Sequence, residues 1–177
     1  MPQDFSAFTT KSDSGLLREL SNTVTVRPSS LIRKSFQIEL NKLIIRAIWD
    51  TGATTTSISQ KLAQTLKLVP IAKATVHSVH ETREVNVHSI DLILPNCVEV
   101  FNLQVTEAAN LGRYDVLIGM DIITLGDFAI TNAKKRTFFS FRYPSDYKHI
   151  DYVVEAKAIY EKKMRRLKQK SRKQKKY

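Results

Sequence analysis

The sequence predicts a mainly β protein, with one domain that contains short helices and a basic C-terminal helix or tail. Short segments that are apolar, or that alternate apolar and polar residues, recur between polar turns as far as residue 141, which is typical of strands. Residues 157–177 hold eleven Lys or Arg against one acid, a net charge of +10 out of the chain's +11. The basicity therefore belongs to the tail. We expect an N-terminal arm over 1–33, a single domain over 34–144, and a basic helical or partly disordered extension over 145–177.

The individual elements follow from spacing and turn residues. Strands are expected over 36–40, 43–49, two segments within 74–90, then 91–94, 98–105, 114–118, 128–130 and 138–141. Helical spacing predicts one short helix over 58–68 with Ser59 as N-cap, and another over 120–125 with Gly126 as C-cap. The N-terminal arm is expected to be loosely structured, with a short helix over 15–20 and a short strand over 23–26.

Two motifs carry the chemistry of the predicted domain. The apolar segment 43–49, expected to be buried on both faces, runs directly into the turn residues Asp50, Thr51 and Gly52. A carboxylate at the end of a buried strand is a candidate for acid–base chemistry. The second apolar segment, 114–118, ends on Gly119 and is followed by Asp121, an acid placed to cap a helix.

The two motifs resemble those of the retropepsin-like aspartic proteases, the single-domain family of retroviruses, retrotransposons and bacterial relatives. In that family an apolar strand leads into Asp-Thr-Gly-Ala, and a later apolar-apolar-Gly motif opens the C-terminal helix; residues 50–53 and 117–119 match both. The resemblance covers roughly residues 35–143. It implies a closed-barrel acid protease fold and a peptidase that needs no metal or organic cofactor. It also implies catalytic roles for Asp50, Thr51 and Gly52, and substrate contacts from Ala53, Thr54, His80, Glu81, Thr82, Leu117, Ile118 and Gly119.

The chain has one Asp-Thr-Gly, whereas the reaction needs two carboxylates. We therefore expect a homodimer in which Asp50 of each chain joins a dyad that activates water to hydrolyse peptide bonds of a polypeptide substrate. Two alternatives remain open at this stage. The chain could be a catalytically inactive dimeric relative that binds peptides, or a nucleic-acid-associated protein that acts through its basic tail.

Three departures from the family pattern bear on the site. Many retroviral members pair an acid two positions after the glycine with a later arginine, and Thr54 and Met120 occupy those positions here. The expected flap, a hairpin over the substrate, has no glycine at its tip. Trp49 is bulkier than the family's usual residue, and we favour a core position for it over a narrowed substrate pocket.

The remaining expectations concern partners and location. The tail 157–177 is either a solvated extension or a handle for nucleic acid or an anionic membrane surface. His77, His80 and His88 are interpreted as exposed strand residues in preference to metal ligands. Cys97, the only cysteine, is expected to be a small strand residue. With no disulfide, no apolar run near ~18 residues and no signal-like N-terminus, the sequence predicts a cytoplasmic protein.

Overall fold

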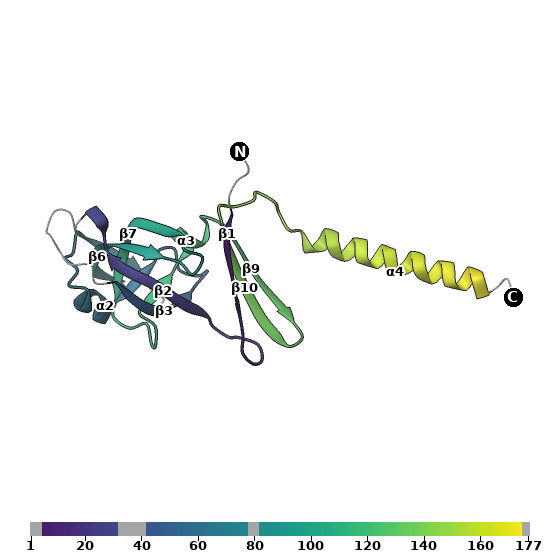
Figure 1. The fold of residues 1–177 in the computed structure, drawn as a ribbon, viewed down its shortest axis with the longest axis horizontal. Coiled ribbons are helices and arrows are strands. Elements are labelled where there is room, and N and C mark those ends of the chain that lie inside the picture. The colour runs from purple at the N-terminus through teal and green to yellow at the C-terminus, as the bar shows by residue number, and fades with distance from the viewer. Residues whose placement is uncertain (1–4, 32–41, 78–81, 175–177) are drawn as a thin grey trace. The chain divides into compact units, whose positions relative to one another are not determined.

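A computed structural model describes residues 5–31, 42–77 and 82–174 of the 177-residue chain. The chain divides into two compact units, Met1–Asp146 and Tyr147–Tyr177. The first unit is mainly β (Figure 1), with the elements β1 (Ser6–Lys11), β2 (Leu20–Pro28), β3 (Leu43–Trp49), β4 (Ser57–Ser59), α2 (Gln60–Thr65), β5 (Ala72–His77), β6 (Thr82–Ile93), β7 (Glu99–Ala108), β8 (Val116–Ile118), α3 (Met120–Ile123), β9 (Asp127–Ala133) and β10 (Arg136–Tyr143). The second unit contains α4 (Tyr152–Gln174).

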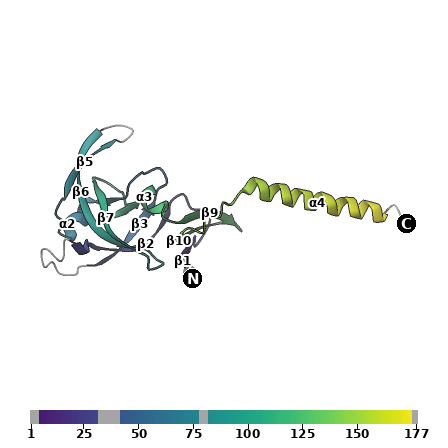
Figure 2. The ribbon, with the colours of Figure 1, turned by 90° about the horizontal axis from the view of Figure 1, so that it is seen from above.

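Six strands close into a barrel. Their order is β2-β3-β8-β4-β7-β6, and β6 pairs back onto β2 from Thr25↔Ile93 to Pro28↔Ile90. A register shift in β6 between Ile90 and Leu92 bends this long strand, as β-bulges do, so that its two halves can serve different neighbours. β5 pairs with the first half of β6 as a hairpin that reaches beyond the barrel (Figure 2). The mainly β, closed-barrel fold is confirmed.

A second sheet, in the order β1-β10-β9, shares its core with the barrel. Phe139 and Phe141 of β10 are fully buried and pack against Trp49, whose ring also stacks on Phe128 at a centroid distance of 5.6 Å. Trp49 is 4% exposed, and its indole N–H donates to Asn22 Oδ1 at 3.1 Å. The core position favoured for Trp49 is confirmed.

The N-terminal region is not the loosely structured arm that the sequence predicted. β1 pairs with β10 along its whole length, and β2 is a wall of the barrel that contains the predicted strand 23–26. Residues 15–20 form no helix; they turn the chain between the two sheets. Ser12 and Leu17 each donate a backbone N–H to Thr137, at 2.9 and 3.0 Å. The partner of β1 is more than a hundred residues away in the chain, which local sequence does not reveal.

Several local predictions also need correction. The segment 91–94 is no separate strand but the end of β6, and Cys97 lies in the following turn, exposed and with φ of 62°. β3 is not buried on both faces throughout, because Ile44 is 75% exposed. The helix after β8 ends with Thr124 as C-cap. Gly126 instead allows close packing, since a Cβ there would collide with the backbone oxygen of Arg142.

The predicted N-cap is confirmed. Ser59 Oγ accepts the N–H of Leu62 at 3.1 Å, although α2 begins only at Gln60 because Ile58 belongs to β4.

The expected strand 36–40 lies outside the described residues. A helix from about residue 150 is also confirmed, as α4. Among the described residues, no helix combines the length and the apolar character needed to cross a membrane.

His88 is buried, contrary to its predicted exposure. Its side chain is 2% exposed, and its Nε2 lies 2.9 Å from Glu107 Oε2 on the neighbouring strand β7. This hydrogen bond lowers the pKa of Glu107 below its ordinary value of 4.5. A charged partner across the sheet thus makes an inward-facing histidine tolerable. The side chain of His77 and all of His80 lie outside the described structure.

Candidate active site

The two motifs found in the sequence lie side by side in the fold. β3 and β8 pair in parallel with Trp49 opposite Ile118, so the chain leaves both strands at the same edge. Asp50, the first residue after β3, donates its backbone N–H to the Ile118 oxygen at 2.9 Å. The acid is therefore attached directly to the strand that precedes Gly119.

The turn after β3 fixes the direction of the Asp50 side chain. Gly52 donates its backbone N–H to Asp50 Oδ1 at 2.8 Å, and Ala53 donates to the Asp50 backbone oxygen at 3.3 Å. Asp50 is half-buried, whereas Thr51 and Gly52 are exposed. The arrangement presents an oriented carboxylate at the surface of the protein, where a second group or a substrate can reach it.

Backbone hydrogen bonds join the next residues to α3. Met120 donates its N–H to the Ala53 oxygen at 2.8 Å, and Asp121 donates to the Thr54 oxygen at 3.2 Å. Thr54 and Met120 stand where many retroviral members carry an acid and an arginine. Main-chain atoms bridge the two motifs at this point instead.

The half-buried Asp121 and the buried Thr56 form a support behind the turn. The Asp121 carboxylate accepts the Thr56 backbone N–H at 2.8 Å and the Thr56 hydroxyl at 2.7 Å. The same hydroxyl accepts the Gly119 N–H at 3.1 Å. Sequence reasoning gave Asp121 a helix-capping role, but Gly119 is the N-cap, and the carboxylate mainly holds Thr56. The sequence did not reveal the role of Thr56. Residues 54–57 all carry hydroxyl groups, but nothing in the sequence shows which hydroxyl is buried.

Gly119 is required because backbone approaches it closely. A Cβ at this position would lie 2.6 Å from the Thr55 carbonyl carbon and 2.7 Å from its oxygen. These contacts are shorter than real Cβ atoms tolerate, and the colliding atoms are main chain. Any side chain here would push residues 53–56 away from α3.

The structure separates the predicted substrate contacts by exposure. Ala53 and Leu117 are half-buried and Thr54 is exposed, so these three can touch a ligand beside Asp50. Ile118 and Gly119 are buried, and each serves the site through its backbone. Thr82 is exposed at the start of β6. His80 and Glu81 lie outside the described residues.

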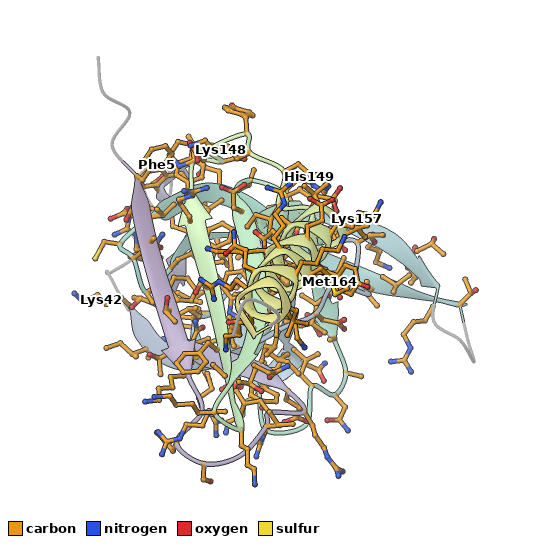
Figure 3. All side chains as sticks on the ribbon, turned by 90° about the vertical axis from the view of Figure 1, so that its right-hand side faces the viewer. Phe5, Lys42, Lys148, His149, Lys157 and Met164 are labelled. Atoms are coloured by element: carbon orange, nitrogen blue, oxygen red, sulfur yellow. The ribbon has the colours of Figure 1, made fainter. Side chains whose placement is uncertain are left out.

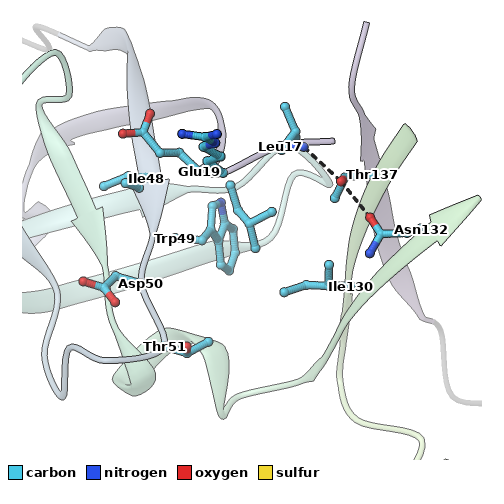
Figure 4. A pocket seen from close by; sticks show the side chains of 11 residues that line it. Leu17, Glu19, Ile48, Trp49, Asp50, Thr51, Ile130, Asn132 and Thr137 are labelled. Atoms are coloured by element: carbon cyan, nitrogen blue, oxygen red, sulfur yellow. Dashed lines mark hydrogen bonds between the residues drawn. The ribbon is translucent and has the colours of Figure 1, made fainter. Parts of the chain in front are cut away.

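A pocket of about 460 Å³ opens beside Asp50 and Thr51 (Figure 4). It is lined by residues 17–20, by the end of β3, and by residues of β9 and β10. Leu17 donates to Thr137 Oγ1 at 3.0 Å, and that hydroxyl donates to Asn132 Oδ1 at 2.8 Å, which fastens one wall. Within the described ranges, no group of three or more His, Cys, Asp or Glu side chains is arranged to hold a metal ion.

Glu19 adds an oriented charge to this pocket. Its carboxylate accepts hydrogen bonds from the Tyr114 hydroxyl, at 2.8 Å, and from the Arg113 guanidinium. The Tyr114 bond first, and then the Arg113 bond, lower the pKa of Glu19 below its ordinary value of 4.5. An anion therefore stands in the pocket wall at neutral pH.

The family model described as gag-polyprotein putative aspartyl protease matches residues 36–124. No curated protein matches the sequence.

Among solved structures, the chain is similar to a retropepsin-like aspartic protease from Rickettsia conorii, with 10% identity, a TM-score of 0.47, and coverage of 80% of this chain and 98% of that one. A foamy viral protease-reverse transcriptase in complex with an RNA/DNA hybrid has 21% identity and a TM-score of 0.39, over 59% of this chain and 11% of that one. The Simian Foamy Virus (mac) protease has 18% identity and a TM-score of 0.35, over 58% and 91%. Since the family model spans just over half of the chain and includes both motifs of the site, the chain belongs to the gag-polyprotein aspartyl proteases, a retropepsin-like family.

Proposed function

We propose that the protein is an aspartic endopeptidase that acts as a homodimer, with Asp50 of each copy supplying one carboxylate of a shared dyad. The observation that carries this proposal is the oriented carboxylate after β3, fixed by the Gly52 N–H and attached to β8. Family membership supports peptide hydrolysis as the reaction class. A single chain has one such turn, so a second copy is the simplest source of the second carboxylate.

The proposed chemistry depends on two carboxylates that share one proton. Two like charges at close range do not both ionise easily, and the aspartic proteases are themselves the standard case of this effect. The ionised Asp50 takes a proton from water, and the oxygen of that water attacks the peptide carbonyl carbon. The protonated Asp50 donates a hydrogen bond to the developing oxyanion, and a proton passes to the departing amine.

For two Asp50 side chains to meet, the two turns must face each other across a two-fold axis. The exposed Thr51 is then at the interface, where its hydroxyl braces the paired turns. The pocket beside Asp50 supports this assignment, because a surface hollow next to the acid offers space for residues of a second copy. Substrate lies across Ala53, Thr54 and Leu117, with β5 and β6 above it and Thr82 as a further contact.

The proposal is tested by the peptide bonds that the protein cuts. New N-termini are compared in lysates treated with wild type, Asp50→Asn, and Asp13→Asn as an exposed control of the same chemical change. We expect wild type and Asp13→Asn to generate the same new termini, and Asp50→Asn to generate none. Circular dichroism and sedimentation establish that Asp50→Asn still folds and assembles. Cleavage by folded Asp50→Asn within a few-fold of wild type would contradict the assignment.

A further inference from the structure

The second unit presents a highly charged helix. The 23 residues of α4 include nine Lys or Arg and two Glu, a net charge of +7. Apolar side chains are nevertheless exposed on it: Val153 is 62% exposed, Tyr160 63% and Leu167 50%. In proteins, most helical stability comes from packing of an apolar face and less from intrinsic helix propensity. The exposed apolar side chains of α4 are therefore expected to contact a partner surface.

More than half of the nine apolar residues of α4 share one face of the helix. At about 100° per residue, five of them fall within an arc of roughly 80°. This apolar stripe consists of Val153, Ala156, Tyr160, Met164 and Leu167.

Cations border the apolar stripe on both sides. By the same helical angle, Lys163 flanks one edge and Lys157 the other. Figure 3 looks along α4 and labels Lys157 and Met164. Away from the stripe, Arg165 pairs with Glu161 at 3.8 Å, one helical turn earlier. The surface is thus a narrow apolar strip within a strongly basic face.

The geometry points to α4 as an interfacial helix that binds an anionic lipid surface, with the apolar stripe at the boundary of headgroups and acyl chains. A mostly polar helix, with aromatic and aliphatic residues on one face and Lys or Arg around them, suits this position. The anionic headgroups neutralise the cations, and the acyl boundary removes the stripe from water.

Charge and apolar character together favour an anionic bilayer over two other candidate partners, a second copy of α4 and a nucleic acid. A second α4 would bring +7 against +7 and has few acids to pair with the lysines beside the stripe. A nucleic acid would match the cations, but its phosphate backbone offers no apolar surface for Tyr160, Met164 and Leu167. An anionic bilayer satisfies both features of the helix.

The test uses the full-length protein and sedimentation with phosphatidylcholine vesicles, with or without phosphatidylserine. We expect binding to the phosphatidylserine vesicles that falls as salt rises, and no binding to phosphatidylcholine alone. A stripe variant, Met164→Gln with Leu167→Gln, should lose vesicle binding. The matched off-stripe variant, Val154→Gln with Ile159→Gln, should retain it. Glutamine is a good helix former, and circular dichroism checks that helix content is unchanged.

A charge variant tests the second half of the proposal. Each basic residue near an anionic surface strengthens binding by a factor of about five. Replacing the cations nearest the stripe, Lys157, Lys163, Lys168 and Lys170, by glutamine should therefore weaken vesicle binding by roughly 600-fold. Duplex DNA and duplex RNA are measured at the same salt concentrations with all variants.

Three results would overturn the proposal. Vesicle binding that is lost in the charge variant but equal in the stripe and off-stripe variants would show a purely electrostatic polyanion handle. Tighter binding to DNA or RNA than to phosphatidylserine vesicles, unaffected by the stripe variant, would assign α4 to nucleic acid. A stripe variant that lowers the melting temperature of the Met1–Asp146 unit, in a protein that binds no vesicles, would assign the stripe to internal packing.

Discussion

Replacing Asp121 by alanine should destabilise the protein more than any exposed acid-to-alanine change. Its carboxylate accepts both the backbone N–H and the hydroxyl of Thr56, at 2.8 and 2.7 Å. Thr56 is fully buried, so its N–H and hydroxyl lose an acceptor inside the protein. The carboxylate also keeps residues 53–56 against α3, directly behind the Asp50 turn. Both stability and activity should therefore respond.

The expected magnitude follows from the groups left without partners. An unsatisfied buried donor costs about 1–3 kcal/mol, and the hydroxyl bond adds about 1 kcal/mol. We expect Asp121→Ala to lower the free energy of unfolding by about 2–4 kcal/mol, a large part of the ~5–15 kcal/mol that stabilises a typical domain. Asp121→Asn keeps one acceptor oxygen and should cost about half as much. Activity should also fall, because a misplacement of about 1 Å can cost ~100-fold.

Urea unfolding at one fixed protein concentration measures this effect, since assembly contributes to apparent stability. Asp13→Ala is the control, because Asp13 is exposed. The order of stability should be wild type, Asp13→Ala, Asp121→Asn and then Asp121→Ala. An Asp121→Ala protein within ~0.5 kcal/mol of the control would refute the supporting role of the carboxylate.

Three further changes give distinct readouts. Gly119→Ala should lose at least about 2 kcal/mol in urea unfolding, because its Cβ would collide with the Thr55 backbone; a neutral effect would mean that residues 53–56 shift freely. Thr51→Val should raise the dissociation constant of the proposed homodimer about tenfold in sedimentation, because the hydroxyl bond proposed for Thr51 across the interface would be lost; unchanged assembly would exclude Thr51 from the interface. Hydrogen bonds from the Asp146 backbone, then Ser145 and Arg142, lower the pKa of Asp127 from 3.8 to about 2. Its stabilisation is therefore present above pH 4 and lost as pH falls toward 2, so the stability gap between wild type and Asp127→Asn should close over that window; a gap that widens would contradict the sign.

The sequence was sufficient to predict those parts of the site whose structure depends on residues that are neighbours in the chain. An apolar strand, an acid and a glycine made the Asp50 turn recognisable, and the hydroxyl of Ser59 identified the start of α2. The closed barrel was expected from the resemblance that these motifs carry. Where the residues that fix an element lie close together in the sequence, the predicted and the observed structures agree.

Long-range pairing decided what the sequence did not reveal. Thr9 pairs with Ser140, so no residue near β1 in the sequence indicates that β1 is a strand of the β1-β10-β9 sheet. His88 is buried because Glu107 approaches it from β7, and a polar residue in a strand otherwise suggests exposure. The support from Asp121 joins residues that are far apart in sequence, which also hid it from local reasoning.

The stoichiometry of the site tests the central claim most directly. Wild type and Asp50→Asn are mixed at constant total concentration, allowed to exchange subunits, and assayed on a peptide identified from the lysate cleavage sites. If each site needs Asp50 from both copies, activity follows the square of the wild-type fraction, so an equal mixture retains about one quarter of the wild-type rate. An equal mixture that retains about half of that rate, with activity proportional to wild-type content, would mean that each chain acts alone and would contradict the shared dyad.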